Sequence, residues 1–420
     1  MIFKFQTGNR FYSYFPFSQP GYENLLDKLI LKRKTTLFLA LVLNALSFLS
    51  AQETVETAVK IVEPNEQKED SEKGKLDYSI FMDSYFLKTN NRLNTDKRSY
   101  TTQALNADSV SLNFALVQVG YENDRVRGKL GLHTGTYVES NYAAEPALSK
   151  NIYEAFGGYR LAKDVWLDVG IFASHIGMEN AISRDNINYT RSLMAENSPY
   201  YESGARLSWQ ATDKLNMKLL LLNGWQVIQD NNKDVSGGTQ VTYDFTPKFS
   251  LNWSTYVGND QPNSSRKQMR YFNHFGFTMK LGSSIEVLGA FDVGQQEKAF
   301  YSQYKRYNDG DYSLLRETKD DGFNRWTAAA LQIRYHINDK LRIGLRGENF
   351  LDKNSVIVST GSPNGFQVAG GSVNIDYQPN DHVLFRIEGK SMNAVDTIFP
   401  NNNQFTRNEK IAVTSMSVWF

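Results

Sequence analysis

The chain ends in Ile411-Ala412-Val413-Thr414-Ser415-Met416-Ser417-Val418-Trp419-Phe420. Side chains of a β-strand point alternately to its two faces, so Phe420, Val418 and Met416 share one face. No charged residue follows Lys410, and the last residue is aromatic. Such a strand either closes a transmembrane β-barrel or lies buried at the end of a soluble β-domain. The rest of the chain has to distinguish these two structures.

Composition favours the membrane barrel. The 420 residues carry a net charge of +1, which provides no strong field for nucleic acid. Cysteine is absent, which excludes disulfides, thiolate nucleophiles and cysteine metal sites. Aromatic residues make up 13% of the chain although its mean hydropathy is low. A barrel explains both properties, because only alternate residues face lipid while aromatic residues form girdles at the two interfaces.

The front of the chain predicts export. The apolar run 37–49 follows Lys32-Arg33-Lys34 and precedes Ser50-Ala51, which is the layout of a secretory signal peptide. The run is too short for a membrane-spanning helix. We therefore expect an upstream extension plus signal peptide over residues 1–51 and a polar, disordered periplasmic lead-in over 52–74. The barrel is expected over residues 75–420.

From Lys75 onward, apolar and polar residues alternate in segments of roughly 10–14 residues, as in barrel strands. The predicted strands include 75–88, 108–122, 125–138 and 165–178. The second of them is expected to divide its residues between two faces: Val110, Leu112, Phe114 and Leu116 against Ser109, Ser111 and Asn113.

Short and long connections alternate between these segments. Tight polar turns occur at 123–125, 162–164, 211–214, 246–248, 282–284, 338–340 and 379–381. Longer polar stretches lie at 88–108, 138–151, 179–199, 227–238, 258–268, 297–325, 351–365 and 391–408. The sequence therefore predicts an all-β fold, a transmembrane antiparallel up-and-down barrel of about 16 strands with short periplasmic turns and long external loops. An even strand number places both termini in the periplasm.

At this point the chain resembles a known family. Four segments carry the resemblance: Phe81-Met82-Asp83-Ser84-Tyr85-Phe86, Tyr201-Glu202-Ser203-Gly204-Ala205-Arg206-Leu207, Asn223-Gly224-Trp225-Gln226 and Arg346-Gly347-Glu348-Asn349-Phe350. Over residues 75–420 the sequence is similar to the β-barrel porins of the OmpL-like type found in Bacteroidetes. The resemblance implies a channel in the bacterial outer membrane through which small hydrophilic solutes diffuse passively.

If the apolar face of each strand contacts lipid, the opposite face lines the lumen. The candidate pore-lining residues on that face are Arg127, Lys129, His133, Arg206, Lys218, Arg334, Arg342, Arg346, Glu348, Arg386, Glu388 and Lys390. A barrel of this size is wide enough for water, and charged side chains at a constriction set selectivity. Two interpretations stay open: the charges set up a transverse field or a mild anion preference, or they pair across adjacent strands and fix the register.

The third long connection, 179–199, would be a loop folded into the lumen by analogy with general porins. An ordinary solvent-exposed loop fits the sequence equally well. Its charged residues are Glu179, Arg184, Asp185, Arg191 and Glu196.

No catalytic or cofactor motif appears in the sequence. The histidines lack the spacing of a metal site, and no Gly-x-Ser-x-Gly or phosphate-binding loop is present. We expect no enzyme, no cofactor and no bound metal. Two alternatives stay open: a barrel hydrolase that uses His133 or His274, and a closed barrel that acts as adhesin or receptor through its external loops.

The expected partners follow from this fold. They are outer-membrane lipid, the barrel-insertion machinery and small hydrophilic solutes, and no nucleic acid. The insertion machinery would recognise the terminal strand through Met416, Val418 and Phe420. A homotrimer is the assembly common among porins of this size.

Overall fold

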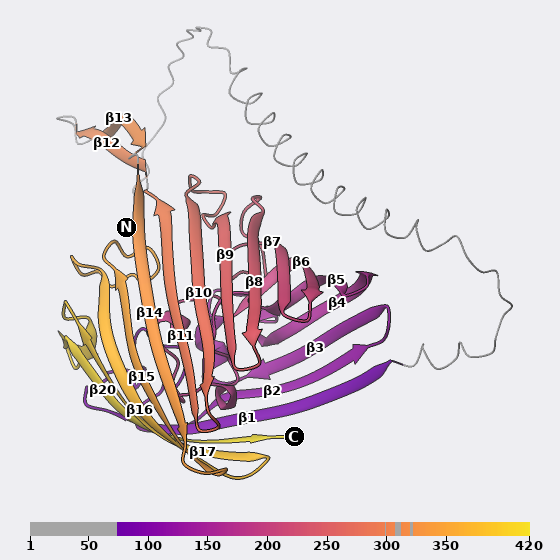
Figure 1. Ribbon diagram of the computed structural model, residues 1–420. Coiled ribbons are helices and arrows are strands. Elements are labelled where there is room, and N and C mark those ends of the chain that lie inside the picture. The colour runs from indigo at the N-terminus through magenta and orange to yellow at the C-terminus, as the bar shows by residue number, and fades with distance from the viewer. Residues whose placement is uncertain (1–73, 299, 307–311, 320–321) are drawn as a thin grey trace, which may run out of the picture. The chain divides into compact units, whose positions relative to one another are not determined.

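The computed structural model describes residues 74–298, 300–306, 312–319 and 322–420 (Figure 1). The expected signal peptide and, apart from Gly74, the expected polar lead-in lie outside the described residues. Within the described part of the chain, no helix is long and apolar enough to cross a membrane.

Sixteen strands form one closed antiparallel barrel in chain order, and β1 pairs with β20 to close it (Figure 1). This confirms the predicted fold class and strand number. The barrel strands are β1 Lys75–Thr89, β2 Val110–Glu122, β3 Val126–Thr134, β4 Ile152–Ala162, β5 Val165–Ala173, β6 Tyr201–Thr212, β7 Leu215–Leu222, β8 Ser236–Thr246, β9 Phe249–Asn259, β10 Met269–Leu281, β11 Ile285–Glu297, β14 Phe323–His336, β15 Leu341–Asp352, β16 Phe366–Asn380, β17 Val383–Ala394 and β20 Asn408–Trp419.

Short turns join the strands at the periplasmic end, and long connections join them at the external end. Asp164 and Gly282 have positive φ of 59° and 64°, which suits tight hairpin turns. Two external connections contain small hairpins of their own, which the sequence did not predict. These are β12 (Phe300–Arg306) with β13 (Tyr312–Lys319), and β18 (Phe399–Asn401) with β19 (Gln404–Thr406).

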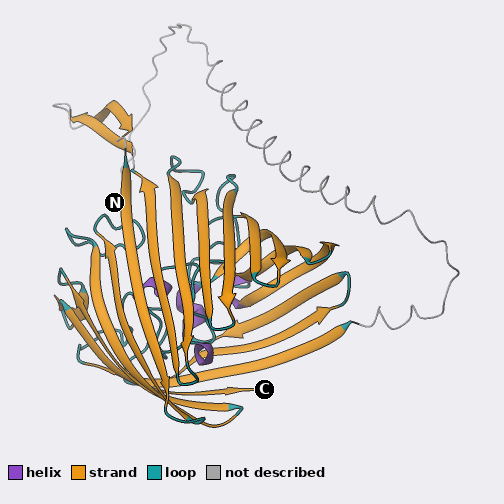
Figure 2. Cartoon of the chain, viewed as in Figure 1, coloured by secondary structure: helices purple, strands orange, loops and turns teal. Residues whose placement is uncertain are grey.

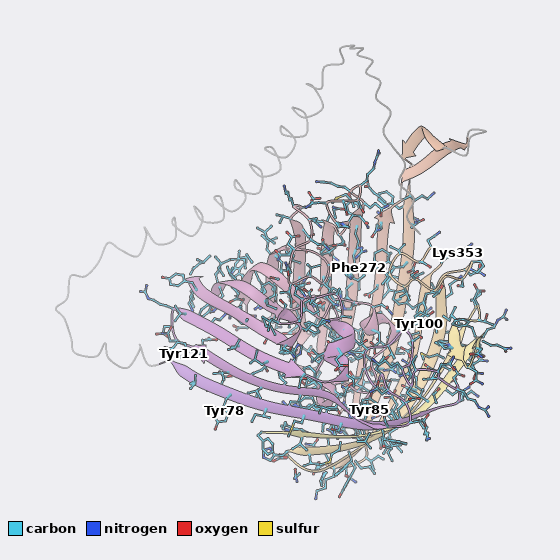
Figure 3. All side chains as sticks on the ribbon, turned by 180° about the vertical axis from the view of Figure 1, so that it is seen from behind. Tyr78, Tyr85, Tyr100, Tyr121, Phe272 and Lys353 are labelled. Carbon is cyan, nitrogen blue, oxygen red and sulfur yellow. The ribbon has the colours of Figure 1, made fainter. Side chains whose placement is uncertain are left out.

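The outer face of the barrel carries most of its exposed large apolar side chains. Tyr78 and Tyr121 lie on this face near the periplasmic end, whereas Phe272 is buried inside the barrel (Figure 3). The two termini of the barrel meet at the same place, because the backbone N–H of Phe420 donates to the carbonyl of Ile80 (3.0 Å). Hydrogen bonding between the first and last strands removes the free sheet edges.

One predicted face is wrong. Phe114 and Leu116 were expected on the outer face, but both are buried inside the barrel. The β1–β2 register passes from Ser84 opposite Leu112 to Asp83 opposite Phe114, so Asn113 is an extra residue in a β-bulge. One extra residue moves every later side chain to the other face.

Loops fill the external half of the barrel interior. The short helix α3 (Leu193–Glu196) lies inside the barrel wall with the other short helices (Figure 2). Leu193 and Met194 join a buried apolar cluster with inward residues of many strands, among them Leu222, Trp326 and Phe350. These loops therefore have a packed core of their own inside the wall.

Candidate diffusion pathway

The connection between β5 and β6, here called L3 (residues 174–200), folds into the lumen. The predicted fifth strand extended to residue 178, but β5 ends at Ala173. The chain turns inward there, because the buried Glu202 carboxylate accepts from Ser174 Oγ (2.8 Å) and contacts His175 Nδ1 (2.8 Å). Of the two arrangements that the sequence left open for this loop, the structure has the folded-in one.

Arg386 on β17 holds the first half of L3. Its buried guanidinium donates from Nη1 to the carbonyl of Ser183 (2.7 Å) and from Nη2 to that of Asn186 (2.8 Å). Asp376 on β16 balances the charge, with 3.0 Å between Arg386 Nε and a carboxylate oxygen. The loop carbonyls at η2 (Ser183–Asp185) are thus satisfied by a strand side chain rather than by water.

Thr190 is held at the centre of the lumen by two strand charges. Glu388 accepts from the backbone N–H of Thr190 (2.6 Å) and from its hydroxyl (2.7 Å). Arg346 on β15 donates to the carbonyl of Thr190 (2.5 Å) and lies 3.2 Å from Glu388. All four contacts are buried, so the charge-assisted hydrogen bonds are not weakened by solvent.

The second half of L3 begins α3 on the same wall. Glu348 accepts from the backbone N–H of Leu193 (2.6 Å), and Lys390 lies 2.9 Å from the Glu348 carboxylate. Ser192 caps the helix, since its hydroxyl accepts from the N–H of Ala195 (3.1 Å). The Glu348 carboxylate is also attracted to the positive partial charge of the backbone N–H groups at this end of the helix.

The first external loop, L1 (residues 90–109), packs onto L3 from above. Glu196 accepts from the backbone N–H of Thr102 (2.7 Å) and from its hydroxyl (2.6 Å). The buried Arg191 guanidinium lies between the rings of Tyr137 and Tyr200, 4.3 and 4.2 Å from their centroids. Nothing in the sequence pattern predicted that L1 enters the barrel.

The opposite wall carries cations that L3 does not cover. We define the cationic wall as the inward side chains of Arg127, Lys129, Arg160, Arg206 and Lys218 on β3, β4, β6 and β7. Asp168 on β5 pairs with Arg127 (2.7 Å) and Arg206 (2.9 Å), and Glu154 pairs with Lys129 (2.9 Å). Glu202 on β6 is a third inward carboxylate, so five cations against three carboxylates leave two positive charges on this wall.

Aromatic rings hold the guanidinium groups of the cationic wall in place. Arg127 and Arg160 lie 4.5 and 4.7 Å from the centroid of Trp166, and Arg206 lies 4.4 Å from that of Phe172. Side-chain exposure is 22% for Arg127 and 37% for Lys129, so both still contact the open lumen. The sequence analysis missed Arg160 and Trp166, although both have inward parity.

The predicted pore-lining residues fall into groups with different surroundings. Their roles in transport stay a prediction. The group on the L3 side is buried: Arg346, Glu348, Arg386, Glu388 and Lys390. Arg334 and Arg342 are half-buried beside it, with Arg334 Nη2 donating to the Asn186 carbonyl (2.5 Å). The group on the cationic wall is partly exposed: Arg127, Lys129, Arg206 and Lys218.

His133 and His274 attach external loops to the barrel wall. His133 is buried under the second external loop, with Nε2 at 2.8 Å from the carbonyl of Lys150. His274 Nδ1 lies 2.6 Å from Asp292 Oδ1. The other carboxylate oxygen of Asp292 accepts from Ser198 Oγ of L3 (3.3 Å). No three carboxylate or imidazole side chains converge as metal ligands among the described residues.

Solved structures of the same fold are outer-membrane channels. The outer-membrane channel DcaP of Acinetobacter baumannii superimposes with a TM-score of 0.55 at 11% identity, covering 83% of this chain and 97% of that chain. The anion-selective porin from Comamonas acidovorans has a TM-score of 0.53 at 9% identity, covering 83% and 100%. The trimer form of OmpT, an outer membrane protein of Vibrio cholerae, has a TM-score of 0.50 at 9% identity, covering 83% and 99%.

At these identities the superpositions establish only the fold, and the match to a sequence family establishes the family. No curated protein matches the chain. The family model described as "Putative beta-barrel porin-2, OmpL-like" matches residues 75–420, the whole of the barrel. The chain therefore belongs to the OmpL-like family of β-barrel porins of the bacterial outer membrane.

Proposed function

We propose that this porin conducts small hydrophilic solutes passively and prefers anions. One observation carries the proposal: the cationic wall has two positive charges in excess and stays in contact with the lumen, while the buried charges on β15–β17 are occupied by L3. Fixed charges beside a narrow aqueous path change the local concentration of permeating ions. The proposal includes no chemical step and no cofactor.

The size of the effect follows from Coulomb's law. A unit charge about 8 Å from a permeating ion contributes about 0.5 kcal/mol in water. Screening at about 0.15 M salt reduces this energy to about 0.2 kcal/mol, which changes the local ratio of anions to cations about twofold for each charge. Arg160 and Lys218 form no salt bridge with a carboxylate among the described residues, and Glu202 and Asp168 act on Lys218 only from a greater distance.

Planar-bilayer recordings test the proposal. The wild-type protein should give stepwise conductance and a reversal potential that shows chloride more permeant than potassium. The double variant Arg160→Gln with Lys218→Gln should lower that permeability ratio by about fourfold. The matched control is Lys353→Gln, which removes a cation from an exposed external loop (Figure 3). A cation-selective wild type contradicts the anion preference, and a folded but silent barrel contradicts conduction itself.

We also propose a homotrimer, inserted by machinery that recognises Met416, Val418 and Phe420. The solved trimer form of OmpT has the same fold, which supports the assembly. Met416 and Phe420 are exposed on the outer face of the closing strand, where an insertion factor can contact them. Molar mass in detergent and the yield of inserted barrel test the two statements separately.

A further inference from the structure

The pairing of β1 with β20, here called the seam, joins the two ends of the barrel sequence. Every other pair of neighbouring barrel strands is linked directly by a turn or a loop, as β9 and β10 are. Such a link keeps two strands close even when their hydrogen bonds open, because closing a short loop costs little entropy. The seam has no link of this kind and depends on the contacts between its strands.

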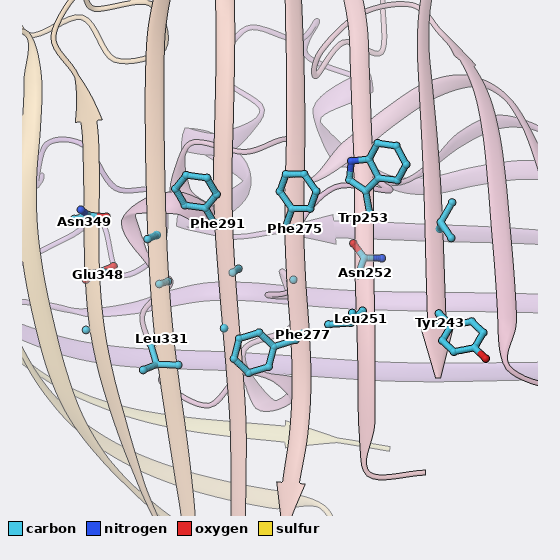
Figure 4. Close-up of a pocket in the computed structure, with 17 residues that line it drawn as sticks. Tyr243, Leu251, Asn252, Trp253, Phe275, Phe277, Phe291, Leu331, Glu348 and Asn349 are labelled. Atoms are coloured by element: carbon cyan, nitrogen blue, oxygen red, sulfur yellow. The ribbon is translucent and has the colours of Figure 1, made fainter. Parts of the chain in front are cut away.

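The outer face of the seam lacks the aromatic pairs found elsewhere on the wall. Trp253, Phe275 and Phe291 stand side by side on adjacent strands, and the rings of Trp253 and Phe275 stack at 6.3 Å (Figure 4). Such cross-strand pairs stabilise neighbouring strands. Across the seam, no outward pair of the described strands joins two aromatic residues; the pairs are Met82 with Val418, Ser84 with Met416, Phe86 with Thr414, and Lys88 with Ala412.

The inner face of the seam is in contact with L3. Phe81 and Trp419 are cross-strand partners on this face. The Arg184 guanidinium of L3 lies over both rings, 5.9 Å from the centroid of Phe81 and 4.8 Å from that of Trp419. Each ring attracts a cation placed over its face. One side chain of L3 therefore bridges the two strands of the seam.

The next inward pair of the seam meets L3 through polar side chains. Ser417 is opposite Asp83 and donates from Oγ to its carboxylate (3.5 Å). Ser183 Oγ of L3 lies 3.4 Å from Ser417 Oγ. All three side chains are fully buried, so no solvent competes for these contacts.

One pair further toward the external end, the contact is apolar. The ring of Tyr189 in L3 packs on that of Tyr85 in β1, with 6.4 Å between their centroids. Both tyrosines belong to a buried cluster that includes Ile411 and Val413 of β20. L3 thus contacts the seam at three successive inward positions of β1.

The same segment of L3 is attached to the strand beside the seam. Arg386 of β17 donates to the carbonyls of Ser183, Asn186 and Asn188. Because β17 pairs with β20, residues 183–189 of L3 span β17, β20 and β1. We call these residues the latch.

We infer that the latch holds β1 and β20 together from inside the lumen, which gives L3 a second function besides occupying the path. The docked latch supplies the seam with contacts that the other strand pairs obtain from their connections or from outward aromatic rings. Local opening of a protein begins where few contacts hold its elements. Release of the latch therefore loosens the seam before it loosens the rest of the wall.

Hydrogen exchange on the folded protein in detergent tests this inference. In the double variant Arg184→Ala with Tyr189→Leu, the backbone amides of β1 and β20 should exchange about tenfold faster than in the wild type. The amides of β9 and β10 should keep the wild-type rate. The matched control is Arg160→Ala, which also removes a guanidinium from a tryptophan ring but away from the seam. Unchanged exchange in β1 and β20, or an equal increase in β9 and β10, overturns the inference.

A disulfide across the seam separates a latch from a general loss of stability. The chain has no cysteine, so Ser84→Cys with Met416→Cys introduces one pair on directly opposed outward positions. Opposed residues of antiparallel strands have Cα atoms about 4.5–5.5 Å apart, which a disulfide can span. The oxidised pair should cancel the faster thermal unfolding of the latch variant, measured by heat-dependent gel mobility. A control pair on β14 and β15, Ala329→Cys with Asn349→Cys, should not. If both disulfides cancel the effect, or neither does, the inference is wrong.

The single variant Arg184→Ala decides the matter if the double variant does not insert. The Arg184 side chain is 31% exposed, so its truncation leaves no buried charge without a partner. Exchange of the β1 and β20 amides should then rise about threefold. A folded Arg184→Ala barrel with wild-type exchange in both strands overturns the inference.

Discussion

Replacing Arg386 with methionine should release L3 from the lumen. The guanidinium is fully buried and donates to three carbonyls of the loop, those of Ser183, Asn186 and Asn188. Methionine keeps much of the apolar stem but has no donor. The substitution therefore removes the hydrogen bonds of Arg386 to the first half of L3 with little change in the packed volume, and leaves the bond from Arg334 to Asn186 in place.

The expected cost is several kcal/mol. A hydrogen bond to a charged group contributes about 1.5–3 kcal/mol, and breaking a buried ion pair by removing one partner costs about 3–5 kcal/mol. The remaining partner, Asp376, would keep only Arg342 at 3.7 Å and the amide of Asn374. A shift of about 3–5 kcal/mol moves the equilibrium between docked and released L3 by about 150- to 5000-fold.

Single-channel recording detects the released loop. The Arg386→Met variant should show larger and noisier conductance steps than the wild type, because L3 no longer stays fixed across the lumen. Limited proteolysis from the external side should cleave L3 in the variant and leave it intact in the wild type. Both assays use the folded, inserted protein.

Two further variants test whether the buried contacts of Arg386 hold L3. Arg160→Met removes a guanidinium of the cationic wall that packs on Trp166 and not on L3. The conductance noise of this variant should therefore match that of the wild type. Adding Asp376→Asn to Arg386→Met removes the unpaired carboxylate and should restore part of the docking. If Arg386→Met conducts with the amplitude and noise of the wild type, the buried contacts do not hold L3.

Three other outcomes follow from the structure. Burial raises the pKa of the Glu179 carboxyl, so docking of L3 should weaken as the pH rises from the ordinary pKa of Glu to this raised pKa. External proteolysis of L3 should increase over the same pH range. The Glu179→Gln variant should lose this pH dependence. Arg191→Lys keeps the charge but loses the planar stack between Tyr137 and Tyr200, about 1–2 kcal/mol, and should lower the melting temperature of the barrel. Phe420→Ser should reduce the yield of inserted barrel, measured by heat-dependent gel mobility, while an equally exposed serine substitution in an external loop should not.

The barrel itself was predictable because its physics is local. Alternation and turn chemistry depend on residues that are close in sequence, and they predicted the strand number and the order of short and long connections. The failure at Phe114 and Leu116 came from the bulge at Asn113. An amide that bonds to Asp83 and Ala104 has no signature in an alternating pattern.

The interior was less predictable because its contacts are distant in sequence. Parity correctly suggested that Arg346, Glu388 and Arg386 point inward. It could not show that their partners are backbone groups of L3, which lie about 150–200 positions earlier in the chain. The inward path of L1 was missed for the same reason, although its uncharged stretch around Ala104 and Leu105 is a signal of burial.

The pairing of Arg98 with Glu409 links the first external loop to the last strand. The two side chains are each 2% exposed, lie 2.8 Å apart and are separated by 311 positions in sequence. Before the last strand arrives, burial of Arg98 would leave an uncompensated charge in the interior. The loop therefore reaches its final position only after the end of the chain has been delivered to the membrane. The interior can therefore pack completely only in a barrel that contains its last strand.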